Sequence, residues 1–172
     1  MTNALARPIL CAIDPGVHST GWALMNLSDK SQQPLVRSSG VIREPNNRPW
    51  LDCADAVSAT LLKLLQDNWV KRVAIEQPQI WTADSSSLAS AARGDLFKLA
   101  VLVGDIIGHL RVGLQNRVEI RLVTPNEWKG QLPKPVVMER VRTILGYNNP
   151  ACRLRDHETD AIAIGLYVFG VF

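Results

Sequence analysis

Two carboxylates in this sequence stand directly after short apolar runs, where burial is expected. Asp14 follows Ala12 and Ile13, and Glu76 follows Ala74 and Ile75. A carboxylate in such a place must be paired or bound to a metal ion to stay ionised. We therefore expect both side chains to have a charged or metallic partner.

Further candidate groups begin a segment of helical periodicity near the C-terminus. His157 and Asp160 are three residues apart and Asp156 and Asp160 are four apart, so either pair shares one helical face. Asp160 precedes a continuous apolar run, which favours a specific role for it, whereas Asp156 and Glu158 also fit an acidic cluster that the helix dipole stabilises. By itself, His157 fits a ligand and a half-buried histidine equally well.

Carboxylates with one imidazole and without cysteine suit Mg²⁺ or Mn²⁺ better than zinc. Two such ions about 4 Å apart activate a water and stabilise the leaving oxygen in phosphodiester hydrolysis. Asp14, on what we expect to be the central strand, is the candidate to bridge both ions.

The elements that must position these groups indicate one α/β domain over residues 1–172. Three closely spaced strands predict an antiparallel meander, and the alternating helices and strands after it predict a mixed five-stranded sheet with helices on both faces. In such a sheet the first and fourth strands can be neighbours, so that Asp14 and Glu76 emerge at one edge. The expected strands cover residues 8–13, 21–27, 35–42, 70–76 and 118–123, and the expected helices cover residues 51–68, 85–110, 135–145 and 156–169.

Composition and charge point to an anionic polymer as partner. The chain has 172 residues, 47% of them hydrophobic and 20% charged, as in an ordinary globular protein. Residues 111–155 carry nine basic and three acidic side chains, and the acids at 156, 158 and 160 follow. A basic stretch beside an acidic cluster suggests a nucleic acid held next to a metal site.

The expected compartment is the cytoplasm. Three cysteines at wide spacing indicate reduced thiols. The first eight residues have no secretory pattern, although a short organellar presequence stays open. The longest membrane-like segment, residues 161–172, is too short to span a bilayer, so no membrane partner is expected.

Five segments, taken in order, resemble the RuvC-type Holliday-junction resolvases of the RNase H-like superfamily. The resemblance extends from about residue 9 to residue 168. It implies an RNase H-like sheet and a homodimeric endonuclease that uses two Mg²⁺ ions per site, with Mn²⁺ as a substitute, to make paired symmetric nicks in a four-way DNA junction. The segments are Ile13-Asp14-Pro15-Gly16 with Thr20-Gly21, Ala74-Ile75-Glu76-Gln77, Ala92-Arg93-Gly94, Val123–Val141 with Lys129 and Lys134, and Asp160-Ala161-Ile162-Ala163-Ile164.

The resemblance also implies the metal ligands and catalytic residues. Asp14, Glu76 and Asp160 match three ligands of the family. A fourth ligand, usually aspartate in the bacterial enzymes, lies one helical turn before Asp160 and falls here on His157. Phage-like relatives resemble this His-Glu-x-Asp form, so we favour His157 over Asp156.

Contacts to DNA follow from the same resemblance. Lys129 and Lys134 match basic positions near the scissile strand, and residues 127–134 are so rich in Gly, Pro and Lys that we expect them to be exposed. Lysine makes a point-charge contact to phosphate. Arg93, Arg140 and Arg142 are further candidates for contacts to the DNA backbone.

Junction distortion and dimerisation depend on two further features. The family usually has an aromatic wedge where this chain has Gln79, and Trp81 lies two residues on, where stacking on a base would contribute about 1–3 kcal/mol. The helix expected over residues 85–110 has more apolar positions than one buried stripe needs, and is the expected dimer face.

Three alternatives stay open. One is another RNase H-like nuclease that acts on branched DNA or on RNA–DNA hybrids. A second is a junction-binding protein whose metal site is weakened by His157. The third, a phosphotransferase of the actin-like ATPase superfamily, is disfavoured by the short chain and by the lack of Gly-rich phosphate loops. A branch-migration motor as partner is undetermined.

Overall fold

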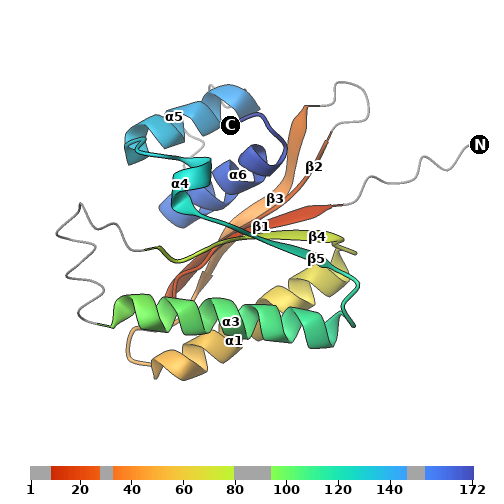
Figure 1. Cartoon of the computed structure of the whole chain (residues 1–172), viewed down its shortest axis with the longest axis vertical. Coiled ribbons are helices and arrows are strands. Elements are labelled where there is room, and N and C mark those ends of the chain that lie inside the picture. Colours follow the sequence, from red (N-terminus) through yellow and green to blue (C-terminus); the bar gives the residue numbers. More distant parts are fainter. Residues whose placement is uncertain (1–8, 28–32, 80–93, 147–153) are drawn as a thin grey trace, which may run out of the picture.

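The computed structural model describes residues 9–27, 33–79, 94–146 and 154–172 and contains a five-stranded sheet in the order β3-β2-β1-β4-β5 (Figure 1). β1 pairs antiparallel with β2 and parallel with β4, which also pairs parallel with β5. The predicted mixed sheet with a central first strand is confirmed. The strands are β1 (Leu10–Asp14), β2 (Ser19–Leu27), β3 (Pro34–Arg43), β4 (Arg72–Glu76) and β5 (Glu119–Val123).

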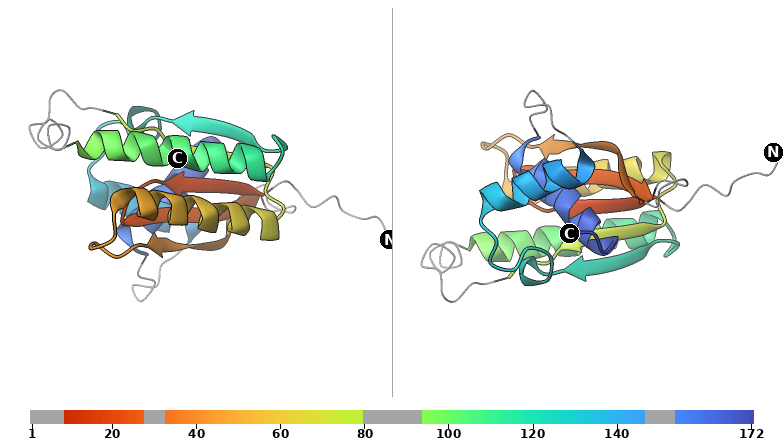
Figure 2. Two further views of the ribbon diagram at one scale, coloured as in Figure 1. Left: turned by 90° about the horizontal axis from the view of Figure 1, so that it is seen from below. Right: turned by 90° about the horizontal axis from the view of Figure 1, so that it is seen from above.

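Helices cover both faces of this sheet (Figure 2). On one side lie α1 (Trp50–Asp67) and α3 (Asp95–Gly113), which pack against each other. On the other side α6 (Asp156–Val168) packs on β1 and β2, and α4 (Pro125–Trp128) and α5 (Lys134–Leu145) lie against α6. Both layers match the α/β architecture expected from the sequence. No helix in the described ranges is long and apolar enough to cross a membrane.

The side chains of the central strands alternate between the two faces of the sheet, and this divides the core into two clusters. Leu10 and Ala12 of β1 pack with α6, whereas Cys11 and Ile13 pack with α1 and α3. Because side chains alternate between the two faces of a strand, Asp14 belongs to the α6 side. The same alternation on β4 places Ala74, and with it Glu76, on the α6 side.

Small residues allow α6 to lie very close to the sheet. Ala12, Ala23 and Ala74 are buried beneath the helix. At Gly21 a Cβ would overlap the carbonyl oxygen of His157 and lie 3.0 Å from the Glu158 amide nitrogen. The glycine is therefore what allows the first turn of α6 to reach the end of β1.

Two expectations about local structure need correction. Residues 85–93 of the helix expected over 85–110 lie outside the described residues; the helix that is described, α3, begins at Asp95, with Gly94 (φ 77°) as its N-cap, and continues beyond residue 110 to Gly113. The expectation that residues 127–134 are exposed fails only at Trp128, which is 3% exposed, whereas the other residues of this segment are half-buried or exposed. This segment starts as the short helix α4, in which the side chains and backbones of Thr124 and Glu127 form a capping box. Lys134 already belongs to the first turn of α5 rather than to a loop.

Candidate metal centre

The carboxyl ends of β1 and β4 bring Asp14 and Glu76 next to each other. Ile13 pairs with Ile75 in the parallel ladder, so the residues that follow them are neighbours at the same sheet edge. Asp14 is 8% exposed, and its position is supported by the turn that follows. The Thr20 hydroxyl donates to the carbonyl oxygen of Gly16 at 2.7 Å and accepts from the Gly16 amide at 3.2 Å, which closes this turn.

The first two turns of α6 contribute His157 and Asp160 to the same place. Nδ1 of His157 lies 2.6 Å from Oδ2 of Asp14. Asp160 is largely buried, and its charge acts on the carboxyl of Glu76. The structure thus brings together the four residues that the sequence analysis proposed as ligands.

The side chains on either side of His157 in α6 contact other partners. Asp156 is exposed and pairs with Lys134 at 3.4 Å. Glu158 accepts a 2.7 Å hydrogen bond from the hydroxyl of Ser39 and caps the helix. Within this turn it is His157, rather than either acid, that contacts Asp14.

Trp128 is a member of the site that the sequence analysis did not single out. Its indole Nε1–H donates to Oε2 of Glu76 at 3.2 Å. The sequence did contain a signal for this role: Trp128 is a tryptophan within a polar segment, and this segment directly follows β5, the neighbour of β4. Its surroundings of Gly, Pro and Lys instead led to the expectation of exposure.

Burial, hydrogen bonding and neighbouring charges shift the pKa values of Glu76, Asp160 and His157. Burial raises the pKa of the Glu76 carboxyl to about 7, and the charges of Asp14 and Asp160 add to the rise. The pKa of Asp160 is raised by its burial first and by Asp14 second. The pKa of His157 is raised because its ring is hydrogen-bonded to Asp14. The site thus contains three carboxylates and one imidazole, which repel or hydrogen-bond one another. These donor types fit a hard divalent cation.

Two lysines lie at the rim of the cluster. The Lys134 ammonium is 3.3 Å from Oδ2 of Asp160; burial works to lower the pKa of Lys134, but Asp160 and Asp156 outweigh it and raise the value. Lys129 lies with Nζ 4.8 Å from the centre of the Trp128 ring, and its charge favours the ionised forms of Glu76 and Asp160.

The other predicted DNA contacts are more distant or lie outside the described residues. Arg140 is exposed on α5, with its guanidinium 5.7 Å from the centre of the Phe172 ring. Arg142, also on α5, is half-buried. Arg93 and Trp81 fall outside the described residues.

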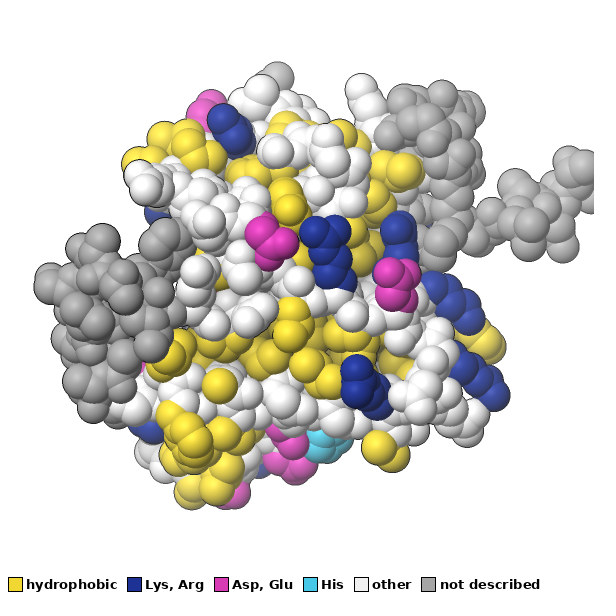
Figure 3. All heavy atoms as spheres, in the orientation of Figure 1, with side chains coloured by type: hydrophobic (Ala, Val, Ile, Leu, Met, Phe, Trp, Pro, Cys, Tyr) yellow, Lys and Arg dark blue, Asp and Glu magenta, His cyan; other side chains and the backbone are white. Residues whose placement is uncertain are grey.

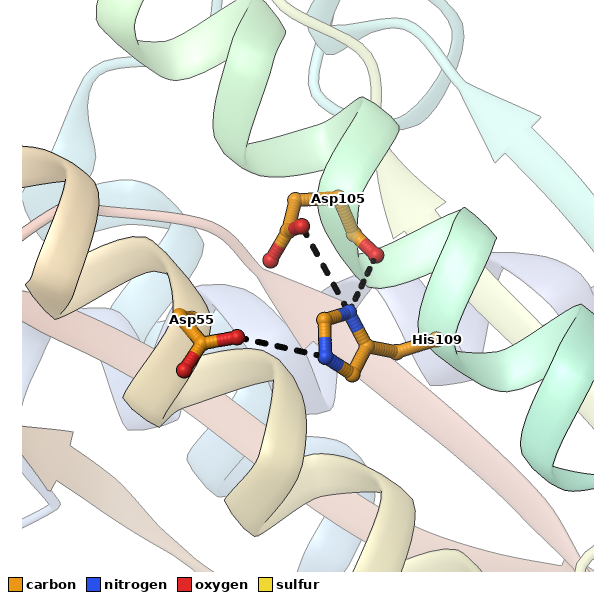
Figure 4. A group of neighbouring side chains, drawn as sticks. All are labelled: Asp55, Asp105 and His109. Atoms are coloured by element: carbon orange, nitrogen blue, oxygen red, sulfur yellow. Dashed lines mark hydrogen bonds and ion pairs between the residues drawn. The ribbon is translucent and has the colours of Figure 1, made fainter.

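A second group of possible ligands connects α1 with α3 (Figure 4). Nε2 of His109 lies 3.4 Å from Asp55, and its Nδ1 lies 3.5 Å from the carboxylate of Asp105 and 3.1 Å from the Asp105 carbonyl oxygen. One ligand atom from each residue lies within 4.8 Å of the others, so this group is tighter than the first. However, Asp55 is 75% exposed and the two ring nitrogens face different carboxylates, so that each nitrogen of His109 already has a carboxylate partner within the protein.

Solved structures of similar architecture are known. RuvC from Thermus thermophilus is 22% identical, with a TM-score of 0.68 over 94% of this chain and 93% of that chain. The same protein in complex with a Holliday junction substrate gives 23% identity and a TM-score of 0.67 over the same shares. The fowlpox virus Holliday junction resolvase is 14% identical, with a TM-score of 0.59 over 95% of this chain and 99% of that one.

These likenesses define the class of fold. The mixed five-stranded sheet and its helices are the RNase H-like fold, as in the RuvC structures. No protein-family model matches the chain, and a search of curated protein sequences gives no match.

Proposed function

We propose that this chain is a structure-specific endonuclease that cuts four-way DNA junctions by metal-dependent phosphodiester hydrolysis. The observation that carries the proposal is the meeting of Asp14, Glu76, His157 and Asp160 at one edge of an RNase H-like sheet. Two solved structures of that fold contain junction DNA, namely the complexes of T. thermophilus RuvC and of the fowlpox virus resolvase.

In this proposal Asp14, Glu76, His157 and Asp160 would hold two Mg²⁺ ions, or Mn²⁺ in their place. When bound, such ions would supply an activated water and stabilise the leaving oxygen. The chain's own residues would orient the substrate: Lys129 and Lys134, at the rim, would contact phosphates near the scissile bond. Arg140, Arg142, Arg93 and Trp81 are proposed to contact the DNA arms farther away.

His157 is proposed as the fourth ligand and as a catalytic residue. Its ring nitrogen contacts Asp14, whereas the carboxylate of Asp156 is exposed and paired with Lys134. The imidazole is also suited to hold a proton beside Asp14, because that hydrogen bond raises its pKa.

A homodimer is proposed to place two such sites on one junction, since a two-fold dimer matches a two-fold substrate. Phe97 and Val112 of α3 are 66% and 82% exposed. Between them lie Gly104 and Gly108, where an added Cβ meets nothing within 4 Å. Glycine inside a helix costs about 1 kcal/mol relative to alanine, a cost that close packing of a second helix would offset. Hydrophobic side chains gather between α3 and β5 (Figure 3), which extends this apolar face.

Cleavage of a synthetic four-way junction tests the proposal. Wild-type protein with Mg²⁺ or Mn²⁺ is expected to nick the junction in symmetric pairs, and to leave a linear duplex and an RNA–DNA hybrid intact. EDTA and Asp14→Asn should abolish the cleavage. Asp55→Asn is the matched control, because it changes a carboxylate of the second cluster, and it should cleave like wild type. Cleavage of the hybrid instead would indicate another RNase H-like nuclease.

The substitution of histidine for an acid supports a second candidate function. An imidazole in place of a carboxylate lowers the negative charge that holds the metal ions, so the protein could bind junctions without cutting them. Tight junction binding with no cleavage in either metal would favour this structural role.

A further inference from the structure

We infer that Trp128 is a positioning residue that orients the Glu76 carboxylate for metal binding. The inference rests on the proposed metal centre. The indole N–H donates to Oε2 of Glu76 at 3.2 Å, and Trp128 is almost fully buried. An indole N–H can only donate, so it serves as a partner for a carboxylate oxygen and never as a metal ligand itself.

The indole is held rigidly from several sides. Its ring belongs to the core cluster beneath α6 and packs at a tilt of 56° on Phe172, with ring centres 6.0 Å apart. The backbone that carries it is fixed by the capping box, in which the Glu127 carboxylate accepts from the Thr124 amide at 2.6 Å and the Thr124 hydroxyl oxygen accepts from the Glu127 amide at 3.2 Å. A donor fixed in this way sets the plane of the carboxylate that it contacts.

The two oxygens of the Glu76 carboxylate therefore have different partners. One oxygen accepts a hydrogen bond from the indole N–H. In this inference the other oxygen is the one offered to a metal ion beside Asp14 and Asp160, whose charges act on this carboxyl. Partners of this kind behind a ligand typically change metal affinity or activity by about 10–100-fold. The face of the same ring also holds the Lys129 ammonium, so Trp128 connects a metal ligand with a proposed phosphate contact.

Mn²⁺ binding without DNA tests this role, measured by calorimetry and by electron paramagnetic resonance of the free ion. Trp128→Phe keeps an aromatic ring and removes the N–H, and is expected to weaken Mn²⁺ binding about tenfold. In junction cleavage, the Mn²⁺ concentration for half-maximal rate should rise by a similar factor, while the rate at saturating Mn²⁺ recovers. A merely structural role would instead lower the melting temperature without this shift in metal dependence.

Trp22→Phe is the matched control, because Trp22 is a half-buried tryptophan of β2 in the opposite core cluster. It should bind Mn²⁺ like wild type. If Trp128→Phe does not fold, β-(3-benzothienyl)alanine at position 128 replaces the N–H with sulfur, keeps the ring shape and carries the same expectation.

The outcomes separate this inference from the proposed function. Mn²⁺ affinity within twofold of wild type in either variant at position 128, together with a clear loss in Glu76→Gln, overturns the role of Trp128 and leaves the metal centre standing. If wild-type protein binds no Mn²⁺, or Glu76→Gln binds it equally well, both the metal centre and the role of Trp128 are overturned.

Discussion

Replacing Gly21 with alanine is expected to displace the start of α6 and disable the candidate metal centre. Gly21 lies opposite Asp14 in the antiparallel ladder, and its Cα faces the backbone of His157 and Glu158. An added Cβ overlaps the carbonyl oxygen of His157, which is backbone and cannot rotate away. The helix must therefore move by about 1 Å or more.

The size of the effect follows from this displacement. Overpacking of a close contact costs about 1–3 kcal/mol of folding free energy, so most of the protein stays folded at 25 °C. A displacement of about 1 Å at a reacting group lowers the rate on the order of 100-fold. Gly21→Ala should therefore lose far more cleavage and Mn²⁺ binding than stability.

Junction cleavage, Mn²⁺ titration and urea denaturation measure these quantities side by side. Gly40→Ala in β3 is the control, because its Cβ meets only side-chain atoms of Trp22, at 3.2–3.4 Å, and these can shift. Wild-type cleavage by Gly21→Ala would refute the reasoning, since α6 would then not depend on contact with the backbone of β2.

Three further predictions concern charge, surface and the dimer. In metal-free protein, Glu76 has a folded pKa of about 7 against an ordinary value of 4.5. The folded state therefore binds more protons than the unfolded state, and the free energy of unfolding falls as pH rises from about 4.5 to 7. Urea denaturation in EDTA should show that Glu76→Gln removes about 1–3 kcal/mol of this loss. Lys134→Ala should weaken junction binding and reduce the slope of log affinity against log salt by about one unit, as measured by fluorescence anisotropy; an unchanged slope would exclude a phosphate contact. Gly104→Leu should yield a folded monomer by light scattering, because its side chain enters open space in the chain itself; an intact dimer would place the interface elsewhere.

Local patterns predicted most of the elements. Apolar runs that end in turn residues marked the strands, and the expected strand ends differ from the observed ones by no more than two residues. The exceptions arose where local composition conflicts with tertiary packing. Gly94 adopts φ 77° as the N-cap of α3, a backbone state that periodicity does not encode. Trp128 is buried although its neighbours in the sequence are polar, because its ring packs into the core cluster that also contains the buried side chains of α6.

The sequence by itself determined which acids follow buried strands and on which face of a strand each lies, because alternation along a strand is a local property. Only the tertiary structure decided which groups meet. Glu76 and Trp128 are 52 residues apart, and His157 and Asp14 are 143 apart, so their contacts depend on strand order and on how closely α6 approaches β2. The tertiary structure also places His157 in contact with Asp14 and Asp156 beside Lys134, since one residue along a helix turns a side chain by about 100°.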